Sequence, residues 1–456
     1  MTERDHLSGL TESIASFVAN LRYEDLPEVA LDIASIGFAD VAGVMMAGSR
    51  EPVVDVLERT FLDQSRSESS LYFGSRRVSV SQAALINATA GHALDFDDAG
   101  GHRSTILVPA ILAQAQPLKL SGPEMLTAYV AGYEVWSELA RREQGQLHER
   151  GWHPTGLYGA IAAACAIARL KGLNAQQVVN AIGVAASSAC GLVANFGSMV
   201  KPFHAGQAAR AGIVAVQLAE NGMLSSANVL EHPRGFLAAV SQHGQYDAVS
   251  PATALGRQWR IGEEGVSIKK YPACYCTHRA IDSAIALVQT AKFDVADVQR
   301  VVVRIGKTQK AILHADQPSS GLEGKFSIQF TIACALVRQS VGLFEVSDQG
   351  VADPAIGALM KRVEVELTDE YDELMKQYAP WDQVSVELKD GSVLEGPRVR
   401  RASGHLENPL AVADLKRKFL MCWEYSGLPT DGPALFDTLI DLRHQHAGWM
   451  DRWLAH

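Results

Sequence analysis

Apolar residues recur at helical spacing over roughly the first 260 residues of the chain. The runs are each about 12–20 residues long, which is an ordinary length for a helix in a globular protein. Their ends carry the expected signals, because Ser121-Gly122-Pro123 precedes one run, Lys171-Gly172 closes another and Asn174 can cap the next. The pattern predicts helices over residues 26–48, 81–94, 109–120, 123–141, 155–170 and 175–190.

Alanine and glycine are abundant in several of these segments, notably residues 160–166, 185–191 and 205–212. Small side chains let helix backbones approach one another closely, and a helix that is apolar on nearly all sides is a buried one. Most of these residues therefore serve packing, and the segment is predicted to form a large helical bundle.

Strand patterns begin after about residue 265. Residues 300–305 are rich in β-branched side chains, and residues 363–367 and 383–388 alternate apolar and polar positions, as half-buried strands do. Asp390-Gly391 is a hairpin turn signal. Helical patterns lie between the strands and after them, at residues 277–291, 324–339, 411–423 and 433–447.

We therefore expect a mainly α protein with an α+β part. A large all-helical domain would comprise residues 1–265 together with residues 401–456, because a lone pair of helices at the end of the chain has little core of its own. Residues 266–400 would form a smaller α+β domain between these two segments.

Composition narrows the possible functions. Of 456 residues, 47% are hydrophobic and 20% are charged, so the chain can bury a large core. A formal net charge of -10, with no run rich in lysine and arginine, disfavours nucleic acid as a partner. The N-terminus lacks a basic region followed by an apolar one, and no apolar stretch of about 18 residues is free of polar interruption. We expect a cytoplasmic protein that does not contact the membrane.

Most of the six cysteines sit in apolar stretches, which indicates buried thiols in a reducing compartment. Cys274 and Cys276 form a C-x-C pair with no second pair behind it, whereas a structural zinc site would normally show two pairs. No metal site is predicted.

A first candidate segment follows the helix predicted at 81–94. Three carboxylates within residues 95–98 face the negative end of the helix dipole, which is unfavourable unless they have partners or a task. Gly100-Gly101 then lets the backbone turn, which leaves His102 and Arg103 to be presented before a helix expected to begin at Pro109. The alternative interpretation is a solvated acidic loop.

Two further segments place a titratable or basic side chain directly before a proline. His153 is therefore expected at a helix start, where the dipole favours the neutral imidazole that can act as a base. Lys201 is expected at another helix start, where its ammonium would invite an anion. His204, Gln207 and Arg210 recur every three residues and could line one face. Capping or packing is the alternative role for these residues.

Residues 267–279 form the hinge between the predicted domains, and pockets often form at such junctions. Positive side chains there can hold carboxylates, and lysine can also transfer protons because its pKa moves on burial. A solvated basic hinge is the alternative. The segments contain no phosphate-binding loop, dinucleotide fingerprint or nucleophile elbow, so they suit proton abstraction beside a carboxylate. The hinge side chains concerned are Lys269, Lys270, His278 and Arg279.

Taken in order, these segments resemble the MmgE/PrpD family, which includes 2-methylcitrate dehydratase, cis-aconitate decarboxylase and iminodisuccinate epimerase. The resemblance implies a helical domain built from both ends of the chain, a smaller α+β lid, a homodimer, and neither cofactor nor metal. It places catalytic residues at Asp95, His102, His153, Lys201 and Lys269. The segments are 92–98 (HALDFDD), 151–156 (GWHPTG), 197–206 (GSMVKPFHAG) and 269–274 (KKYPAC), with 324–330 and 404–410 fitting as well. Substrate contacts are expected from Arg103, His204, Lys270, Tyr271, His278 and Phe330.

Three positions depart from the family pattern. Ala99 stands where members often have a hydroxyl residue, Arg103 where proline is usual, and Phe330 where decarboxylase-like members have tyrosine. Two possible hydroxyl donors are thus missing, while Arg103 adds a guanidinium group that can bind a carboxylate through two N–H groups. The leading hypothesis is a cofactor-independent lyase that acts on a small polycarboxylate by acid–base proton transfer, like 2-methylcitrate dehydratase. The alternatives are an epimerase of an amino- or imino-polycarboxylate, a cis-aconitate-type decarboxylase, and an inactive polycarboxylate-binding protein.

Overall fold

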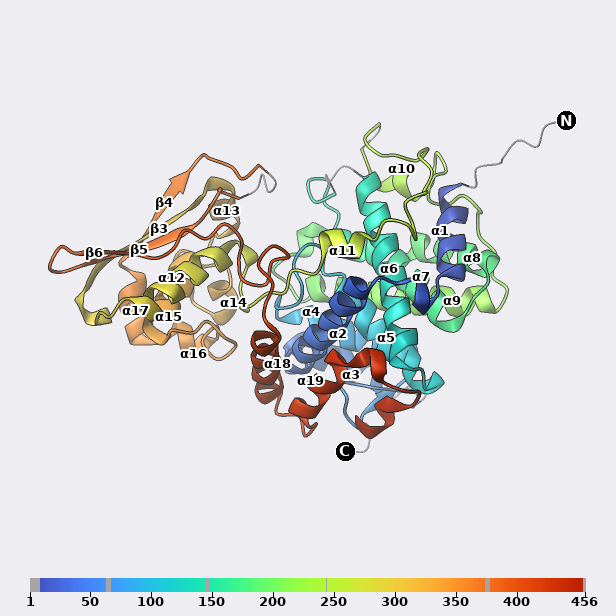
Figure 1. Ribbon diagram of the computed structural model, residues 1–456, viewed down its shortest axis with the longest axis horizontal. Helices are drawn as coiled ribbons and strands as arrows, with labels where there is room; N and C mark the ends of the chain where they lie inside the picture. The colour runs from blue at the N-terminus through green and yellow to red at the C-terminus, as the bar shows by residue number, and fades with distance from the viewer. Residues whose placement is uncertain (1–8, 63–66, 144–146, 243, 374–377, 454–456) are drawn as a thin grey trace. The chain divides into compact units, whose positions relative to one another are not determined.

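The structure of the protein, a computed structural model, consists of two compact units (Figure 1). Unit 1 contains the chain up to Val266 and again from Cys422, and unit 2 contains Ser267–Met421. The residue pattern placed the boundaries between the two domains after residue 265 and before residue 401. In the structure the second boundary lies between Met421 and Cys422, within helix α18 (Val412–Ser426). The residues described are 9–62, 67–143, 147–242, 244–373 and 378–453.

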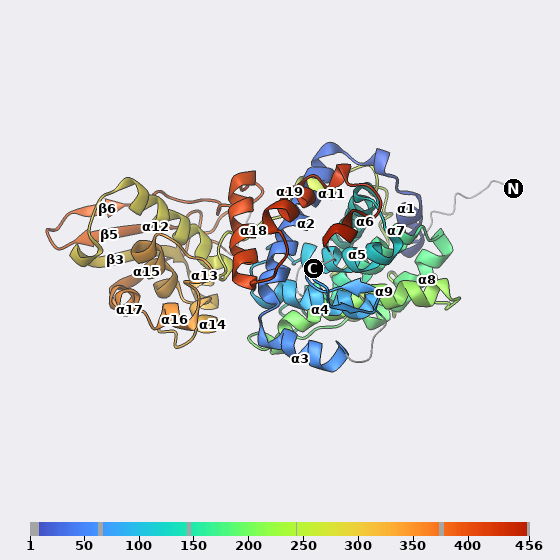
Figure 2. The ribbon, with the colours of Figure 1, turned by 90° about the horizontal axis from the view of Figure 1, so that it is seen from below.

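Unit 1 is a bundle of helices in several layers with one short two-stranded sheet, which confirms the helical part of the predicted fold (Figures 1 and 2). Helix α9 packs against both α4 and α7, with α5 and α6 beside them. The elements are α1 (Leu10–Asn20), α2 (Glu28–Gly48), α3 (Pro52–Phe61), β1 (Ser69–Ser70), β2 (Arg77–Val78), α4 (Val80–Ala93), α5 (Ser104–Leu118), α6 (Gly122–Arg142), α7 (Pro154–Lys171), α8 (Ala175–Ser188), α9 (Val200–Glu220), α10 (Phe236–Val240), α11 (Arg260–Glu264) and α19 (Gly432–Ile440).

Glycine allows the close approach of the central helices. A side chain at Gly206 of α9 would lie 2.4 Å from the carbonyl oxygen of Leu85 in α4. One at Gly212 would lie 2.5 Å from the side chain of Ala163 in α7. Both distances are shorter than packed atoms permit, so the run 205–212 brings α9 against both neighbours.

Helix boundaries follow the capping signals with one exception. Asn174 caps α8, because its side-chain oxygen accepts the backbone N–H of Gln177 at 3.0 Å. Helix α5 begins at Ser104 and contains Pro109, so the predicted start at Pro109 was wrong. The Ser104 N–H donates to Asp98 at 3.3 Å, which satisfies one donor of the first turn, and the proline removes only a single later N–H.

Helix α2 is the one described helix that is long and apolar enough to cross a membrane. Of its most apolar window, 78% is buried within the protein, and the helix packs against α4, α5 and α19. A core helix of a bundle meets the same criteria of length and composition. Asp32 and Asp40 interrupt its apolar sequence.

A buried carboxylate holds α11 against α6. Glu134 accepts the backbone N–H groups of Arg260 and Ile261 at 3.1 and 2.9 Å, which are donors that the first turn of α11 leaves free. Burial raises the pKa of Glu134 to about 7, even though these hydrogen bonds oppose the shift. The folded protein therefore retains this proton where the unfolded chain loses it.

Replacing Glu134 with glutamine should make the protein less sensitive to alkaline pH. Glu134 has a pKa of about 7 in the folded protein and an ordinary pKa of 4.5 in the unfolded chain. As the pH rises from 4.5 through about 7, this difference lowers the free energy of unfolding by roughly 3 kcal/mol. We expect the thermal midpoint of Glu134→Gln, relative to wild type, to rise by a few degrees between about pH 5 and pH 8. The exposed Glu149→Gln serves as control. The same difference from wild type at both pH values would contradict the prediction.

Unit 2 is built on a four-stranded sheet in the order β4-β3-β5-β6. Strand β3 (Val298–Gly306) pairs in parallel with β4 (Val363–Thr368) and antiparallel with β5 (Gln383–Leu388), which pairs with β6 (Val393–Glu395). These strands confirm the predicted ones. Gly391, with a φ of 86°, provides the left-handed residue of the predicted hairpin turn.

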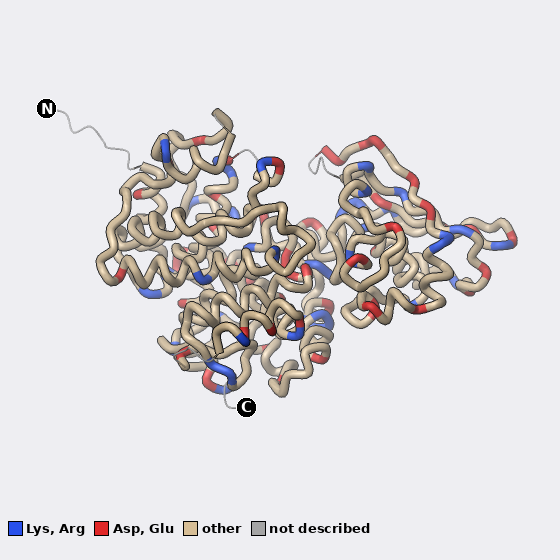
Figure 3. Tube along the Cα trace, turned by 180° about the vertical axis from the view of Figure 1, so that it is seen from behind, with Lys and Arg blue, Asp and Glu red and all other residues tan. Residues whose placement is uncertain are grey.

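Helices of unit 2 cover one face of this sheet (Figure 1), and the hydrophobic core lies between the two layers. Acidic and basic residues are interspersed along the chain in both units (Figure 3). Unit 2 contains α12 (His278–Thr290), α13 (Lys307–Ile312), α14 (Gly321–Gly324), α15 (Ile328–Arg338), α16 (Asp348–Val351), α17 (Pro354–Met360) and the start of α18.

Candidate active site

Histidines from four segments of unit 1 meet beside the ends of α4, α7 and α9. The ring centroid of His92 lies 4.3 Å from that of His102 and 6.1 Å from that of His153. The His153 ring in turn lies 5.3 Å from His204 and 6.3 Å from His148. His102, His153 and His204 were predicted from the sequence, whereas His92 and His148 were not. His92 could have been predicted from its position at the start of the acidic motif at residues 92–98.

Asp97 joins two of these rings. Its carboxylate lies 3.0 Å from Nδ1 of His92 and 2.8 Å from Nδ1 of His102. Burial alone would raise the pKa of Asp97, but the His102 and His92 imidazoles outweigh it and hold that pKa well below its usual range. Burial lowers the pKa of His92 to about 4, so this ring is neutral at pH 7. Asp95 was the residue predicted in this motif, and Asp97 was not singled out.

The backbone between α4 and α5 is held in an unusual conformation. Asp95 and His102 have φ angles of 51° and 60°, in the left-handed region that side chains disfavour. Gly100 and Gly101 between them have φ angles of 83° and 115°, as the predicted sharp turn requires. Such strain persists only where the surroundings dictate it, and it is typical of functional sites.

Lys201 and Asp95 form an ion pair that remains reachable from solvent. The Lys201 ammonium lies 2.7 Å from Oδ1 of Asp95, and the two side chains are 19% and 18% exposed. Lys201 stands in the first turn of α9, as predicted, and lies 5.5 Å from the ring centroid of Phe196. This pair is a partly accessible charged group beside the histidines.

His153 occupies the predicted position directly before α7, and its ring faces α9. Its Nδ1 lies 3.1 Å from Nδ1 of His204, so one ring donates and the other accepts. Its backbone N–H donates to the carbonyl of Gly191 at 2.9 Å, which ties the helix start to the next loop. Burial, followed by nearby histidines and Lys201, holds the pKa of His153 far below its usual value. Burial and Lys201 also lower the pKa of His204.

Arg103, predicted to hold a substrate carboxylate, is already engaged in unit 1. Its guanidinium lies 2.6 Å from Glu264, donates to the Ser137 hydroxyl at 3.1 Å, and stands 4.5 Å from the ring centroid of Tyr133. A substrate carboxylate would have to replace Glu264. Arg210 does not share a face with His204, because it stacks on Phe61 at 5.7 Å while His204 is buried toward His153. An interval of three residues drifts around a helix of 3.6 residues per turn, so that part of the interpretation was wrong.

Predicted site residues of unit 2 are described within that unit. Lys269 is buried with 3% exposure. Lys270 lies 3.6 Å from Asp282, which also accepts the Tyr271 hydroxyl at 2.7 Å. His278 is fully buried with its Nε2 3.2 Å from a backbone carbonyl, and Phe330 lies in the hydrophobic core. The roles of these residues in a site stay predictions.

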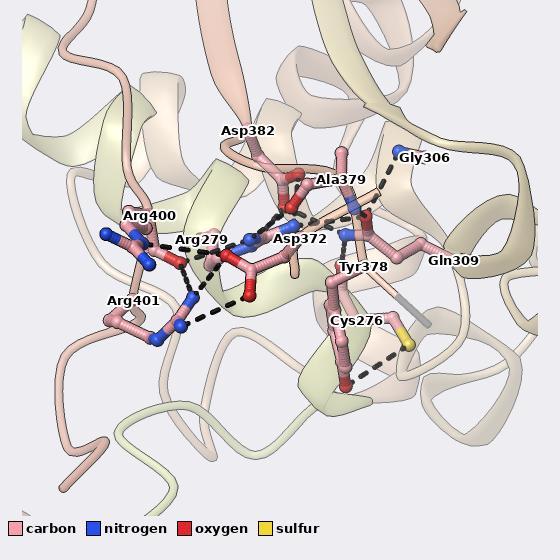
Figure 4. Close-up of polar contacts among 10 residues, drawn as sticks. All are labelled: Cys276, Arg279, Gly306, Gln309, Asp372, Tyr378, Ala379, Asp382, Arg400 and Arg401. Carbon is pink, nitrogen blue, oxygen red and sulfur yellow. Dashed lines mark hydrogen bonds and ion pairs between the residues drawn. The ribbon is translucent and has the colours of Figure 1, made fainter. Parts of the chain in front are cut away.

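Arg279 has a structural task within unit 2 (Figure 4). Its guanidinium binds both oxygens of Asp382, at 3.0 and 2.8 Å, and also donates to Gln309 and to the carbonyl oxygens of Ala379 and Arg400. Burial raises the pKa of Asp382 to about 6 although Arg279 opposes it. Because its donors are used in this way, Arg279 is not a positive group free for substrate, contrary to the interpretation of the hinge.

Four side chains of the histidine site have the chemistry of metal ligands. One ligand atom from each of His92, Asp95, Asp97 and His102 lies within 4.8 Å of the others. The sequence predicted no metal here. In this arrangement the Lys201 ammonium balances Asp95, and two imidazoles face the oxygens of Asp97, so both carboxylates are accounted for without an ion.

Comparison with protein families identifies the family of this chain. The family model of the MmgE/PrpD N-terminal domain matches residues 12–248, and that of the MmgE/PrpD C-terminal domain matches residues 271–430. The chain belongs to the MmgE/PrpD family. The resemblance drawn from the ordered motifs is thereby confirmed.

Curated relatives of this MmgE/PrpD protein match it along most of their length. Cis-aconitate decarboxylase of Mus musculus is 27% identical over 434 residues, which cover 91% of this chain and 86% of the relative. The enzyme of the same name from Homo sapiens is 28% identical, with coverage of 91% and 87%, and that of Aspergillus terreus is 26% identical, with coverage of 89% and 86%. The protein is thus a member of an enzyme family, and the similarity supports a lyase-type function.

The site of this MmgE/PrpD protein combines three chemical capabilities. Burial keeps the imidazoles of His153 and His204 in the neutral form, in which each ring has one nitrogen lone pair that can accept a proton from a substrate. The Lys201–Asp95 pair offers a cation at the start of α9, where the helix dipole also favours an anion. Asp97 orients two further imidazoles. Together these groups suit proton transfer to or from carbon beside a bound carboxylate.

Proposed function

We propose that this MmgE/PrpD protein is a lyase that acts on a small polycarboxylate by acid–base proton transfer and needs no cofactor. The observation that carries the proposal is a group of buried neutral histidines next to the accessible Lys201–Asp95 pair. A neutral imidazole has a lone pair that can accept a proton from carbon, while an ammonium at a helix start binds a carboxylate. His102 and His153 are the candidate proton-transfer groups, and Lys201 is the candidate anion-binding group.

Decarboxylation of an unsaturated tricarboxylate has the most support, because relatives that match nearly the whole chain are named cis-aconitate decarboxylases. In this reaction the bond from carbon to one carboxylate breaks, CO₂ leaves, and the electron pair stays on the substrate. A histidine that has taken up a proton from solvent, and is therefore an imidazolium, then gives that proton to the resulting carbanion and returns to the neutral form. Positive groups that hold the remaining carboxylates stabilise the charge that develops.

Two positions favour an epimerase as the second candidate. Ala99 and Phe330 lack the hydroxyl groups that could donate to a leaving group or a carboxylate, and this weakens both the hydro-lyase reaction suggested by the residue pattern and decarboxylation. An epimerase needs only two groups that take and return a proton at one carbon. His102, between α4 and α5, and His153, before α7, approach from different segments of unit 1.

One experiment separates these reactions. The full-length protein is incubated in D₂O with cis-aconitate, 2-methylcitrate and an aminodicarboxylate, and the products are followed by NMR. Loss of CO₂ with deuterium on the product indicates decarboxylation, a new alkene from the hydroxy acid indicates dehydration, and exchange with inverted configuration indicates epimerisation. The absence of exchange and turnover with every candidate would contradict the proposed function.

A further inference from the structure

We propose that Asp97 is a positioning residue for the acid–base chemistry of this site, because its carboxylate holds His92 and His102 together as Nδ1–H tautomers. The Nε2 atom of His102 is then the nitrogen that exchanges a proton with the substrate. The inference rests on the proposed function and adds to it a residue that acts through the histidines and not on the substrate.

The geometry of Asp97 is that of one acceptor shared by two donors. Its Oδ2 lies 3.0 Å from Nδ1 of His92 and 2.8 Å from Nδ1 of His102, and the two rings are tilted by 59° with centroids 4.3 Å apart. The side chains of Asp97 and His92 are fully buried, while that of His102 is 16% exposed. Of the two rings, His102 is the one within reach of a small molecule.

Hydrogen-bond chemistry determines the tautomers. An ionised carboxylate only accepts, and a neutral imidazole has one N–H. Each ring must therefore carry its hydrogen on Nδ1, because the other tautomer would set a lone pair against the carboxylate. The Nε2 atom of His92 is buried and has no hydrogen-bond partner among the residues that the structure describes, in keeping with a hydrogen placed on Nδ1.

This arrangement has a direct consequence for proton transfer. When the substrate C–H bond breaks, the proton goes to Nε2 of His102 and the electron pair stays on carbon; protonation of a carbanion is the reverse. The ring becomes an imidazolium during the first step, and Asp97 stabilises that positive charge through the 2.8 Å contact. His92, locked on the same carboxylate, prevents Asp97 from turning away.

The test uses Asp97→Asn, Asp97→Glu and Asp98→Asn. An asparagine accepts with one atom and donates with the other. Nδ1 of His92 lies 3.1 Å from Oδ1 and 3.0 Å from Oδ2 of Asp97, so the amide NH₂ faces this ring in either orientation and favours its Nε2–H tautomer. Glutamate keeps an acceptor at a shifted position. Asp98 is the matched control, since it is an equally buried carboxyl one position along, its hydrogen-bond partner is the Ser104 N–H, and burial raises its pKa to about 6.

Tautomers are read from ¹⁵N NMR of protein labelled at histidine, with the signals of His92 and His102 assigned among 14 histidines by His92→Gln and His102→Gln. We expect Nδ1–H signals for both rings in wild type and in Asp98→Asn, and one Nε2–H signal in Asp97→Asn. On the substrate found above, kcat of Asp97→Asn should fall about 10²-fold with KM changed less than about 3-fold, whereas Asp97→Glu should lose less than about 10-fold.

An Nε2–H signal from either histidine of the wild-type protein would overturn the inference, as would unchanged tautomers and kcat in Asp97→Asn. Equal losses in the asparagine and glutamate variants with unchanged tautomers would show a purely structural role and overturn it as well. The wild-type spectrum decides the matter even if Asp97→Asn does not fold. Because tautomers are measured without turnover, failure of the proposed function is distinguishable from failure of this inference.

Discussion

Replacing Lys201 with methionine is expected to lower kcat/KM by about 10³-fold, because the variant loses the cation that we propose binds the substrate carboxylate and stabilises the developing charge. Its ammonium lies 2.7 Å from Asp95 in the first turn of α9. Without it, Asp95 loses the ammonium 2.7 Å from its Oδ1 and faces an anionic substrate without that positive charge, so binding and catalysis should both be reduced. Methionine preserves most of the length and apolar volume of the side chain.

The matched control is Lys171→Met. Lys171 ends α7 and pairs with Glu220 at the end of α9, so it is a lysine–carboxylate pair at the opposite end of α9 from Lys201. Its loss should change kcat/KM less than about 2-fold, since exposed ion pairs contribute little. Steady-state kinetics on both variants, with circular dichroism to confirm folding, checks the prediction. Lys201→Met within about 10-fold of wild type would exclude the assigned role.

Replacing His153 with glutamine should lower kcat by about 10³-fold while KM changes little, because the amide can bond to His204 but cannot exchange a proton. The depressed pKa of His153 also defines a pH dependence. A histidine with a lowered pKa stays neutral well below 6.5, so its contribution to kcat should remain constant from about pH 8 to below that value.

His232→Gln is the control for this variant, since His232 accepts the Arg234 N–H at 3.0 Å elsewhere in unit 1. Its kcat should match that of wild type. Single-turnover measurements separate the chemical step from product release and show whether the loss lies in proton transfer. If His153→Gln retained wild-type turnover, the role of neutral histidines in the proposed function would have to be abandoned.

Local sequence signals predicted much of the fold. Helical and alternating periodicities predicted the central helices and strands β3, β4 and β5, because the burial of one face imposes a spacing that is visible along the chain. Residues before prolines predicted that His153 and Lys201 would stand at helix starts, since proline restricts the preceding backbone. Such features depend on neighbours in sequence, and they could be predicted without knowledge of the tertiary structure.

The start of α5 could not be predicted in this way. Pro109 is a strong local signal for a helix start, but the helix begins at Ser104, where Asp98 accepts the terminal N–H. Whether a carboxylate six positions earlier reaches a helix terminus depends on how the intervening turn folds. That turn contains two non-glycine residues, Asp95 and His102, with positive φ angles, and local preferences disfavour such angles.

The partners of the site side chains were decided by the tertiary structure. Sequence alone indicated that Asp95, His102, His153 and Lys201 are the residues to examine, both by their chemistry and by the ordered motifs. The pairing of His153 with His204, across 51 positions, exists only because glycines let α9 pack closely against α4 and α7.

The same holds for Arg103 and Asp97. Arg103 was predicted to bind a substrate carboxylate, but the fold brings Glu264 to its guanidinium from a distant segment of unit 1. Asp97 looked like one of three equivalent carboxylates, and the fold places two imidazoles on it. The residue pattern thus determined which elements form and which groups could carry chemistry. Packing decided which group faces which, since hydrogen bonds and ion pairs between remote residues depend on distances that spacing along the chain does not contain.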